Sequence, residues 1–211
     1  DGRKMSKSLR NYPDPNEMFA QYGADAMRWM LLASPILRGA DFSVTEAGIR
    51  DTVRHVVLPL WNAYSFLTMY ANAAGLRGTV RTDMPDVLDR YLMGELRGLV
   101  ESVTSHMDGY DLYGACDSVA TFIDTLTNWY IRRSRDRFWA GDQDAIDALH
   151  TALVTLCQVA APLLPLVTEH IHGGLVGADG DGTVPSVHLS DWPDASSFPH
   201  DADLHAGMAV V

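Results

Sequence analysis

The chain has 211 residues, of which 47% are hydrophobic and 20% are charged, and its formal net charge is −11. This composition allows a buried core and excludes an intrinsically disordered chain. No apolar run is long enough to span a bilayer, so we expect no membrane role. The strongly negative net charge argues against a protein that binds nucleic acid over its whole surface. Cys116 and Cys157 lie in apolar helical patterns without a CxxC spacing, which predicts buried, reduced thiols in a cytoplasmic protein. We expect the chain to be a monomer.

The first third of the chain predicts three helices. Asp14 precedes a proline and then an acidic residue, which is a typical helix start, and this short helix should end at Gly23. A second helix is expected over about 24–34. A capping box at 43–46 begins a long helix that should end at Gly75 and kink at Pro59.

After a polar linker over 76–85, apolar residues at helical spacing predict further long helices over about 88–103, 112–139 and 146–160. A proline-rich break and a short helix follow, then a segment over 186–189 that is expected to be extended. The last residues, LHAGMAVV, look like the beginning of another amphipathic helix. No sustained strand alternation occurs, so the predicted fold class is all-α, an antiparallel helix bundle preceded by a small, mostly helical segment.

The sequence KMSKS near the start contains both lysines of the chain, Lys4 and Lys7, whereas the other fourteen basic side chains are arginines. Such a bias suggests that these two positions need the chemistry of lysine. Lysine carries a compact charge on a flexible stem, whereas arginine presents a rigid planar fork. A mobile point charge suits phosphate groups that move during a reaction. The alternative is an ordinary basic loop in solvent.

A second basic cluster lies in the sequence NWYIRRSRDRFW over 128–139. Helical spacing puts Arg132 and Arg135 on one face, and Arg133 and Arg137 along the apolar stripe. Arg133 and Arg137 are therefore the better candidates for ion pairs between helices. Arg132 and Arg135 are the better candidates for RNA phosphates, which dominate the affinity of proteins for nucleic acids.

Three aromatic residues in the same stretch could stack on unpaired RNA bases. Trp129 and Tyr130 are more plausibly part of the core, because aromatic side chains at helical spacing usually are. Trp139 lies at the end of the predicted helix and is the more open of the three. No metal site is expected: His170 and His172 are two residues apart on a predicted helix and therefore face different directions.

Several stretches together resemble the C-terminal half of isoleucyl-tRNA synthetases, which are class I aminoacyl-tRNA synthetases. They are KMSKSLRNYPDP, WNAYSFLTMYAN, NWYIRRSRDRFW, APLLPLVTEHI and SVHLSDWP, and they occur in the order and at the spacing of that family. The resemblance covers nearly the whole chain. It implies three parts: the KMSKS loop with a stem-contact segment over 1–44, an anticodon-binding helix bundle over 45–175, and a loop with a C-terminal extension over 176–211.

The resemblance also implies a role for the KMSKS loop, which in this family closes over ATP. Lys7 would be the principal contact to phosphate and Lys4 its support, favouring the transition state in which charge builds on the departing pyrophosphate. Ser6 and Ser8 would add hydroxyl hydrogen bonds, and Met5 would anchor the loop by packing. ATP with magnesium would serve the parent enzyme, and neither is expected to bind this chain alone.

By the same resemblance, the parent enzyme joins isoleucine to its tRNA, and isoleucine tRNA is the expected partner of this chain. The HIGH tetrapeptide of the family is absent, so we expect no catalysis by the chain alone, only tRNA binding, with Arg132, Arg135 and Trp139 as candidate contacts. Two alternatives stay open. The chain could be the same region of a valine-specific synthetase, or a free-standing helical interaction module in which KMSKS is incidental.

Overall fold

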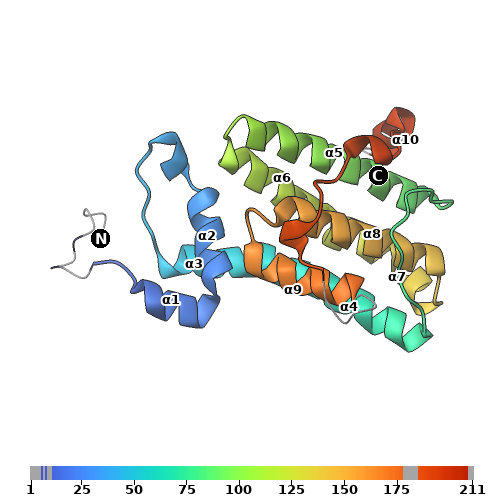
Figure 1. Ribbon diagram of the computed structural model, residues 1–211, viewed down its shortest axis with the longest axis horizontal. Coiled ribbons are helices and arrows are strands. Elements are labelled where there is room, and N and C mark those ends of the chain that lie inside the picture. Colours follow the sequence, from blue (N-terminus) through green and yellow to red (C-terminus); the bar gives the residue numbers. More distant parts are fainter. Residues whose placement is uncertain (1–5, 7, 9–10, 178–184, 209–211) are drawn as a thin grey trace.

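A computed structural model describes residues 6, 8, 11–177 and 185–208. Within these residues every regular element is a helix, which confirms the predicted all-α class (Figure 1). In the described part of the chain no helix is both long and apolar enough to cross a membrane. Lys4, Met5 and Lys7 lie outside the described residues.

The first helices form a small unit at one end of the molecule, the left side of Figure 1. Its elements are α1 (Pro15–Tyr22), α2 (Ala24–Leu32), the 3-10 turn η1 (Pro35–Arg38) and α3 (Glu46–Thr52). Asp14 caps α1 by accepting a hydrogen bond from the N–H of Asn16, and Thr45 caps α3 in the same way. The buried side chains of this unit form a core cluster of their own: Met18, Ala26, Met30 and Ile49.

The expected long helix that ends at Gly75 is present, but it contains a π-helical turn. It consists of α3, the π-helix η2 (Val53–Val57) and α4 (Leu58–Ala74). Pro59 has no N–H to donate to the carbonyl four residues earlier, and the wider turn immediately precedes it. The helix ends where predicted: Gly75 adopts φ 67° and its N–H reaches back to the carbonyl of Ala71.

The remaining helices pack beside α4 and form the bundle (Figure 1). They are α5 (Val87–Asp108), α6 (Leu112–Asp124), the π-helix η3 (Thr125–Ile131), α7 (Arg132–Trp139), α8 (Gln143–Ala160) and α9 (Pro165–Val176). The helix expected over 112–139 is therefore interrupted by a π-helix, which apolar periodicity did not predict. α5 packs against both α6 and α8, and α9 packs against α8.

α8 lies at the centre of the bundle and is buried on nearly every side. The apolar residues Ile146, Leu149 and Leu153 are fully buried, which accounts for its position. Cys116 and Cys157 are buried and unpaired, as predicted. Burial raises the pKa of each thiol to about 12, so both stay protonated and inert at neutral pH.

The polar face of α8 holds the linker that joins α4 to α5. Asp147 accepts a hydrogen bond of 2.8 Å from the N–H of Thr79, and the hydroxyl of Thr151 accepts one of 3.0 Å from the N–H of Arg81. These buried side chains satisfy linker N–H groups that have no helical partner. The polar side chains of α8 thus fix a segment that has no regular structure of its own.

The C-terminal part crosses the bundle as short turns. The segment expected to be extended over 186–189 is instead a 3-10 turn, η4 (Val187–Leu189), so that prediction was wrong. The hydroxyl of Ser186 caps this turn, and the carboxylate of Glu169 accepts the N–H of Val187 at 2.9 Å. After η5 (Ala195–Ser197), the expected last helix is present as α10 (Ala202–Met208), which lies against α5.

Candidate nucleic-acid interface

Of the KMSKS stretch, the structure describes only the two serines. Their hydroxyl groups are 2.8 Å apart and hydrogen-bonded, and the N–H of Ser6 donates to the side-chain oxygen of Asn11 at 2.9 Å. Ser8 is exposed. Both hydroxyls are thus engaged in a local turn, and the phosphate roles of Lys4, Met5, Ser6, Lys7 and Ser8 stay predictions from the resemblance.

The second predicted site is built on η3 and α7, which form one continuous helical rod. Within η3, the hydroxyl of Thr127 donates to the carbonyl of Ile123 at 2.8 Å, and the side chain of Asn128 donates to Asp124. Ser and Thr hydroxyls that bond to the carbonyl four residues earlier compete with regular helix bonds. π-helical turns are rare in proteins and frequent at functional sites.

α7 presents two arginines and a tryptophan to solvent. In an α-helix Arg132, Arg135 and Trp139 point within about 60° of one another. All three are exposed, Trp139 to 65% of its surface. Neither arginine forms a hydrogen bond or ion pair with a described residue, so both guanidinium groups are available to an outside anion. The sequence-based assignment of these two arginines to the open face agrees with this exposure.

The position of Trp139 is supported by α4. Its indole N–H donates a hydrogen bond to the hydroxyl of Tyr70, which lies 69 residues earlier in the chain. This bond fixes the indole at the C-terminal end of α7 while leaving most of its ring in solvent. A large, rigid and partly open aromatic face next to two free arginines can stack on an unpaired base whose phosphates the arginines bind.

Arg137 has the structural role that its spacing predicts. Its terminal nitrogens Nη1 and Nη2 donate to the two carboxylate oxygens of Asp89 at 2.7 and 2.8 Å, and its Nε donates to Asp142 at 2.7 Å. Asp142 also caps α8, and Asp86, 3.4 Å from Nη1, caps α5. One guanidinium group therefore ties α7 to the N-terminal ends of two neighbouring helices.

Tyr130 completes this buried network. Its hydroxyl donates to Asp89 at 2.7 Å, and both residues are fully buried. Burial, with the charge of Asp89, raises the pKa of Tyr130 well above its usual value, so the phenol stays a neutral donor. Burial acts to lower the pKa of Arg137, but its hydrogen bonds to Asp89 and Asp142 outweigh that effect and raise it. The predicted core position of Tyr130 is confirmed.

Arg133 and Trp129 contact each other beside the candidate interface. The guanidinium group of Arg133 lies over the indole of Trp129, 5.0 Å from the ring centroid, which is a cation–π contact. Trp129 in turn packs on Tyr91 of α5, with ring centroids 4.8 Å apart. Trp129 is half-buried against the core, as expected, whereas Arg133 is exposed.

No group of three or more His, Cys, Asp and Glu side chains among residues 11–177 and 185–208 has the arrangement of a metal site. His170 stacks on Trp61, with centroids 5.5 Å apart, and His172 is buried. The two histidines therefore have different surroundings, in line with their spacing.

Two features of the interface were not predicted from the sequence. Tyr70 and Tyr91 support Trp139 and Trp129 from other helices. Each of these tyrosines lies within a predicted helix, and no local pattern connects it to its partner. Only the packing of α4 and α5 beside α7 brings them there.

Comparison with known proteins places this geometry in a family. The model of the anticodon-binding domain of tRNA ligases matches residues 89–211, which is more than half of the chain and includes the whole of η3 and α7. The chain belongs to this family. The model of class I tRNA synthetases for isoleucine, leucine, methionine and valine matches residues 1–43, the part that contains KMSKS.

Curated relatives support the resemblance seen in the sequence. The isoleucine–tRNA ligase of Mycobacterium tuberculosis is 56% identical over 211 residues, which are all of this chain and 19% of that protein. The isoleucine–tRNA ligase of Corynebacterium efficiens is 55% identical over 214 residues, also all of this chain and 19% of that protein. The predicted resemblance to isoleucyl-tRNA synthetases is confirmed. The chain spans about a fifth of the length of these relatives.

A solved structure shows the same fold. The ternary complex of LeuRS, tRNA and LeuAMS from Agrobacterium radiobacter K84 matches 97% of this chain and 23% of that chain, with a TM-score of 0.63 and 20% sequence identity. At this identity the likeness concerns the fold alone. It agrees with the predicted helix bundle of a class I synthetase anticodon-binding domain.

Proposed function

We propose that this chain is the anticodon-binding portion of an isoleucine–tRNA ligase, and that it binds the anticodon stem-loop of isoleucine tRNA through α7. The membership of the anticodon-binding family supports the RNA partner. The relatives, named isoleucine–tRNA ligases and more than half identical in sequence, support isoleucine over valine.

The proposal rests on the different surroundings of the arginines on α7. Of its four arginines, Arg137 binds Asp89 in the buried network, whereas Arg132 and Arg135 are exposed beside the open ring of Trp139. The net charge of the chain is −11, so such a local group of free cations can attract phosphates without making the whole surface bind nucleic acid nonspecifically. The aromatic ring adds stacking on an unpaired base.

For the parent enzyme we propose activation of isoleucine with ATP and magnesium, followed by transfer to the tRNA. The support is the KMSKS stretch, where Lys7 would meet the phosphates and Lys4 assist, and the match of residues 1–43 to the class I synthetase family. We expect the chain alone to bind tRNA without catalysing the reaction, as a cytoplasmic monomer.

The test is fluorescence anisotropy of the 211-residue chain with labelled isoleucine tRNA, at low and at moderate salt. Valine and methionine tRNAs are the matched competitors. We expect the isoleucine tRNA to bind most tightly, with an affinity that falls as salt rises, because phosphate binding releases counterions. Replacing both Arg132 and Arg135 by Ala should abolish most of this binding.

Each other outcome is informative. Tightest binding to the valine tRNA would support the valine-specific alternative. No binding to any tRNA at low salt would contradict the proposal that this chain suffices for recognition. Equal binding to all three tRNAs would leave a phosphate-binding surface but overturn the proposed anticodon reading.

A further inference from the structure

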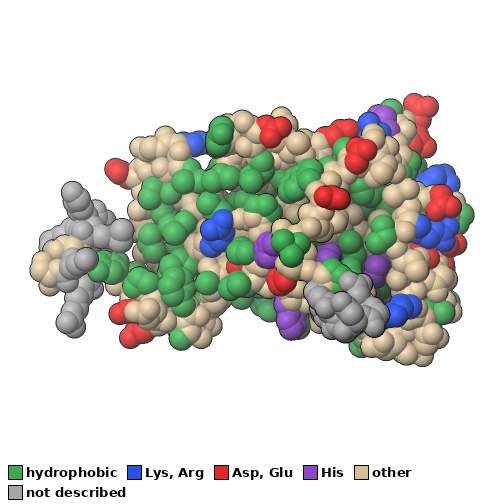
Figure 2. All heavy atoms as spheres, in the orientation of Figure 1, with side chains coloured by type: hydrophobic (Ala, Val, Ile, Leu, Met, Phe, Trp, Pro, Cys, Tyr) green, Lys and Arg blue, Asp and Glu red, His purple; other side chains and the backbone are tan. Residues whose placement is uncertain are grey.

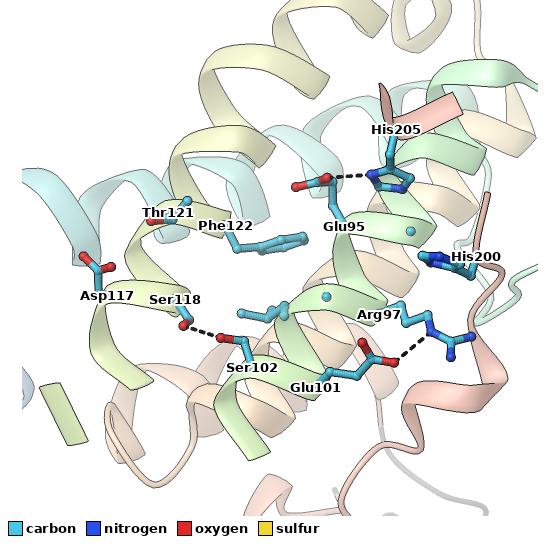
Figure 3. A pocket seen from close by; sticks show the side chains of 13 residues that line it. Glu95, Arg97, Glu101, Ser102, Asp117, Ser118, Thr121, Phe122, His200 and His205 are labelled. Carbon is cyan, nitrogen blue, oxygen red and sulfur yellow. Dashed lines mark hydrogen bonds and ion pairs between the residues drawn. The ribbon is translucent and has the colours of Figure 1, made fainter. Parts of the chain in front are cut away.

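The last helix, α10, rests on α5 through few contacts. None of its side chains is buried. Its main anchor is His205, whose Nδ1 lies 3.0 Å from the carboxylate of Glu95 (Figure 3). The ring of His205 also lies 4.8 Å from that of Tyr91. A short helix held mainly by one side chain can leave its site at modest cost in free energy.

The surface of α5 is shaped to receive this histidine. The imidazole of His205 lies directly over Gly94, so that a Cβ atom at this position would overlap the ring. One turn further along α5, a Cβ atom at Gly98 would meet nothing within 4 Å. The two glycines thus differ in their surroundings: α10 covers Gly94 and does not cover Gly98. Beyond His205 an open groove of about 480 Å³ continues between α5 and α6 (Figure 3).

The covered site belongs to a row of rings that leads to the candidate interface. His205 packs on Tyr91, Tyr91 packs on Trp129, and the guanidinium group of Arg133 lies over Trp129. Arg133 is adjacent in sequence to Arg132, and successive residues of an α-helix point about 100° apart. Arg133 thus points about 100° from Arg132 and about 160° from Arg135, so the aromatic row reaches α7 on the side that adjoins Arg132.

We propose that Tyr91, supported from behind by Trp129, forms a second stacking surface for unpaired RNA bases, and that α10 covers it until RNA takes the place of His205. This inference rests on the proposed RNA-binding function and extends it to α5. The rings suit the role: they are half-buried, and stacking on aromatic faces tolerates any base. Burial, together with the charge of Glu95, raises the pKa of Tyr91 to about 12, so its ring stays uncharged.

The contact between His205 and Glu95 holds α10 over Tyr91 in the unbound chain. Glu95 lies beside Tyr91 on α5, where its negative charge repels RNA phosphates, and Nδ1 of His205 contacts its carboxylate at 3.0 Å in the covered state. Release of α10 therefore removes the contact of this carboxylate with His205 and leaves its negative charge next to the incoming RNA. The affinity measured for RNA is then the affinity of the open state reduced by the fraction of molecules in that state.

The experiment compares Gly94→Ala with Gly98→Ala. Both changes remove a glycine from the same helix and favour the helix equally, but only the first displaces His205. Hydrogen exchange of the α10 amides reports whether the helix has left, and anisotropy with isoleucine tRNA reports the affinity. We expect Gly94→Ala to speed exchange in α10 and to tighten binding about five- to tenfold, with Gly98→Ala within twofold of the unmodified chain.

Two further variants should also release α10, without replacing a glycine of α5. His205→Ala should also expose the surface, and Glu95→Gln should loosen α10 and remove the repulsion of phosphates. Both are expected to tighten binding. Adding Tyr91→Leu to Gly94→Ala should cancel the gain, because the ring that stacks on the base is gone.

The outcomes separate this inference from the proposed function. If the unmodified chain binds tRNA, and Gly94→Ala releases α10 without tightening that binding, the second stacking surface does not exist. If release of α10 weakens binding, α10 is part of the RNA site and the inference is wrong. If the unmodified chain does not bind at all, the proposed function itself fails, and this inference with it.

Discussion

Arg137 holds Asp89 through both of its terminal nitrogens, at 2.7 and 2.8 Å, inside a bundle where the side chain of Asp89 is fully buried. The two residues are 48 positions apart. Since Asp142 and Asp86 meet the same guanidinium group, the pair fixes α7 against α5 and α8. This pair therefore sets the orientation of the face that carries Arg132 and Arg135.

Asp89→Ala should destabilise the fold strongly. Removal of one partner of a buried ion pair leaves the other charge uncompensated, which costs about 3–5 kcal/mol. Here Arg137 keeps Asp142, so we expect the lower end of that range. Urea denaturation followed by circular dichroism measures the change. The control is Glu101→Ala, which breaks the more exposed ion pair with Arg97 and should cost less than about 1 kcal/mol. Equal losses in the two variants would contradict the structural role of Asp89.

Arg132→Ala and Arg135→Ala should weaken tRNA binding through charge. Each variant is expected to lower the slope of the logarithm of the binding constant against the logarithm of salt concentration by about 0.7–0.9, because one phosphate contact is lost. Binding measured at four or more salt concentrations gives this slope. Arg54→Ala is the matched control, since Arg54 is exposed on η2, far along the chain from α7. An unchanged slope in both α7 variants would show that these arginines do not contact RNA phosphates.

Trp139 offers a test of stacking apart from hydrogen bonding. Trp139→Ala should weaken tRNA binding by about 1–3 kcal/mol, the usual contribution of a base stacked on an aromatic ring. Trp139→Phe loses the hydrogen bond to Tyr70 but keeps a ring, so we expect it to retain most of the affinity. Isothermal titration calorimetry with the anticodon stem-loop distinguishes the two. If Phe is as damaging as Ala, the indole serves to position α7 and does not stack.

Burial lowers the pKa of His150 below the ordinary value of 6.5, so the folded state disfavours its protonated form. The unfolded chain takes up this proton as the pH falls through 6.5, whereas the folded chain does so only at lower pH. His150 therefore contributes a loss of stability on acidification in this window, at most about 1.4 kcal/mol per pH unit. We expect His150→Gln to reduce the difference in the free energy of unfolding between pH 7.5 and 5.5. His55→Gln, which replaces a histidine at an exposed position, is the matched control. A difference as large in His150→Gln as in the original chain would contradict the burial effect.

Features that depend on neighbouring residues could be predicted from the sequence. The cap at Asp14 and the left-handed glycine at position 75 lie where it predicted, because each depends on bonds within one helical turn. The predicted capping box at 43–46 begins with Ser43, whereas the residue that caps α3 is Thr45. Apolar spacing within α7 separated Arg137 from Arg132 for the same reason. The family resemblance was also readable, since it rests on short motifs in order.

Contacts between residues far apart in the chain could not be predicted, because they depend on helix packing. Asp89 and Arg137, Tyr70 and Trp139, and Gly94 and His205 are each joined by helix packing, and no local pattern links the members of a pair. The π-helix η3 likewise lies within an unbroken apolar stripe, where periodicity predicted an ordinary helix. A sequence specifies the turns and the buried face of each helix through interactions a few residues apart. The partners across helices depend on how those faces fit together in three dimensions.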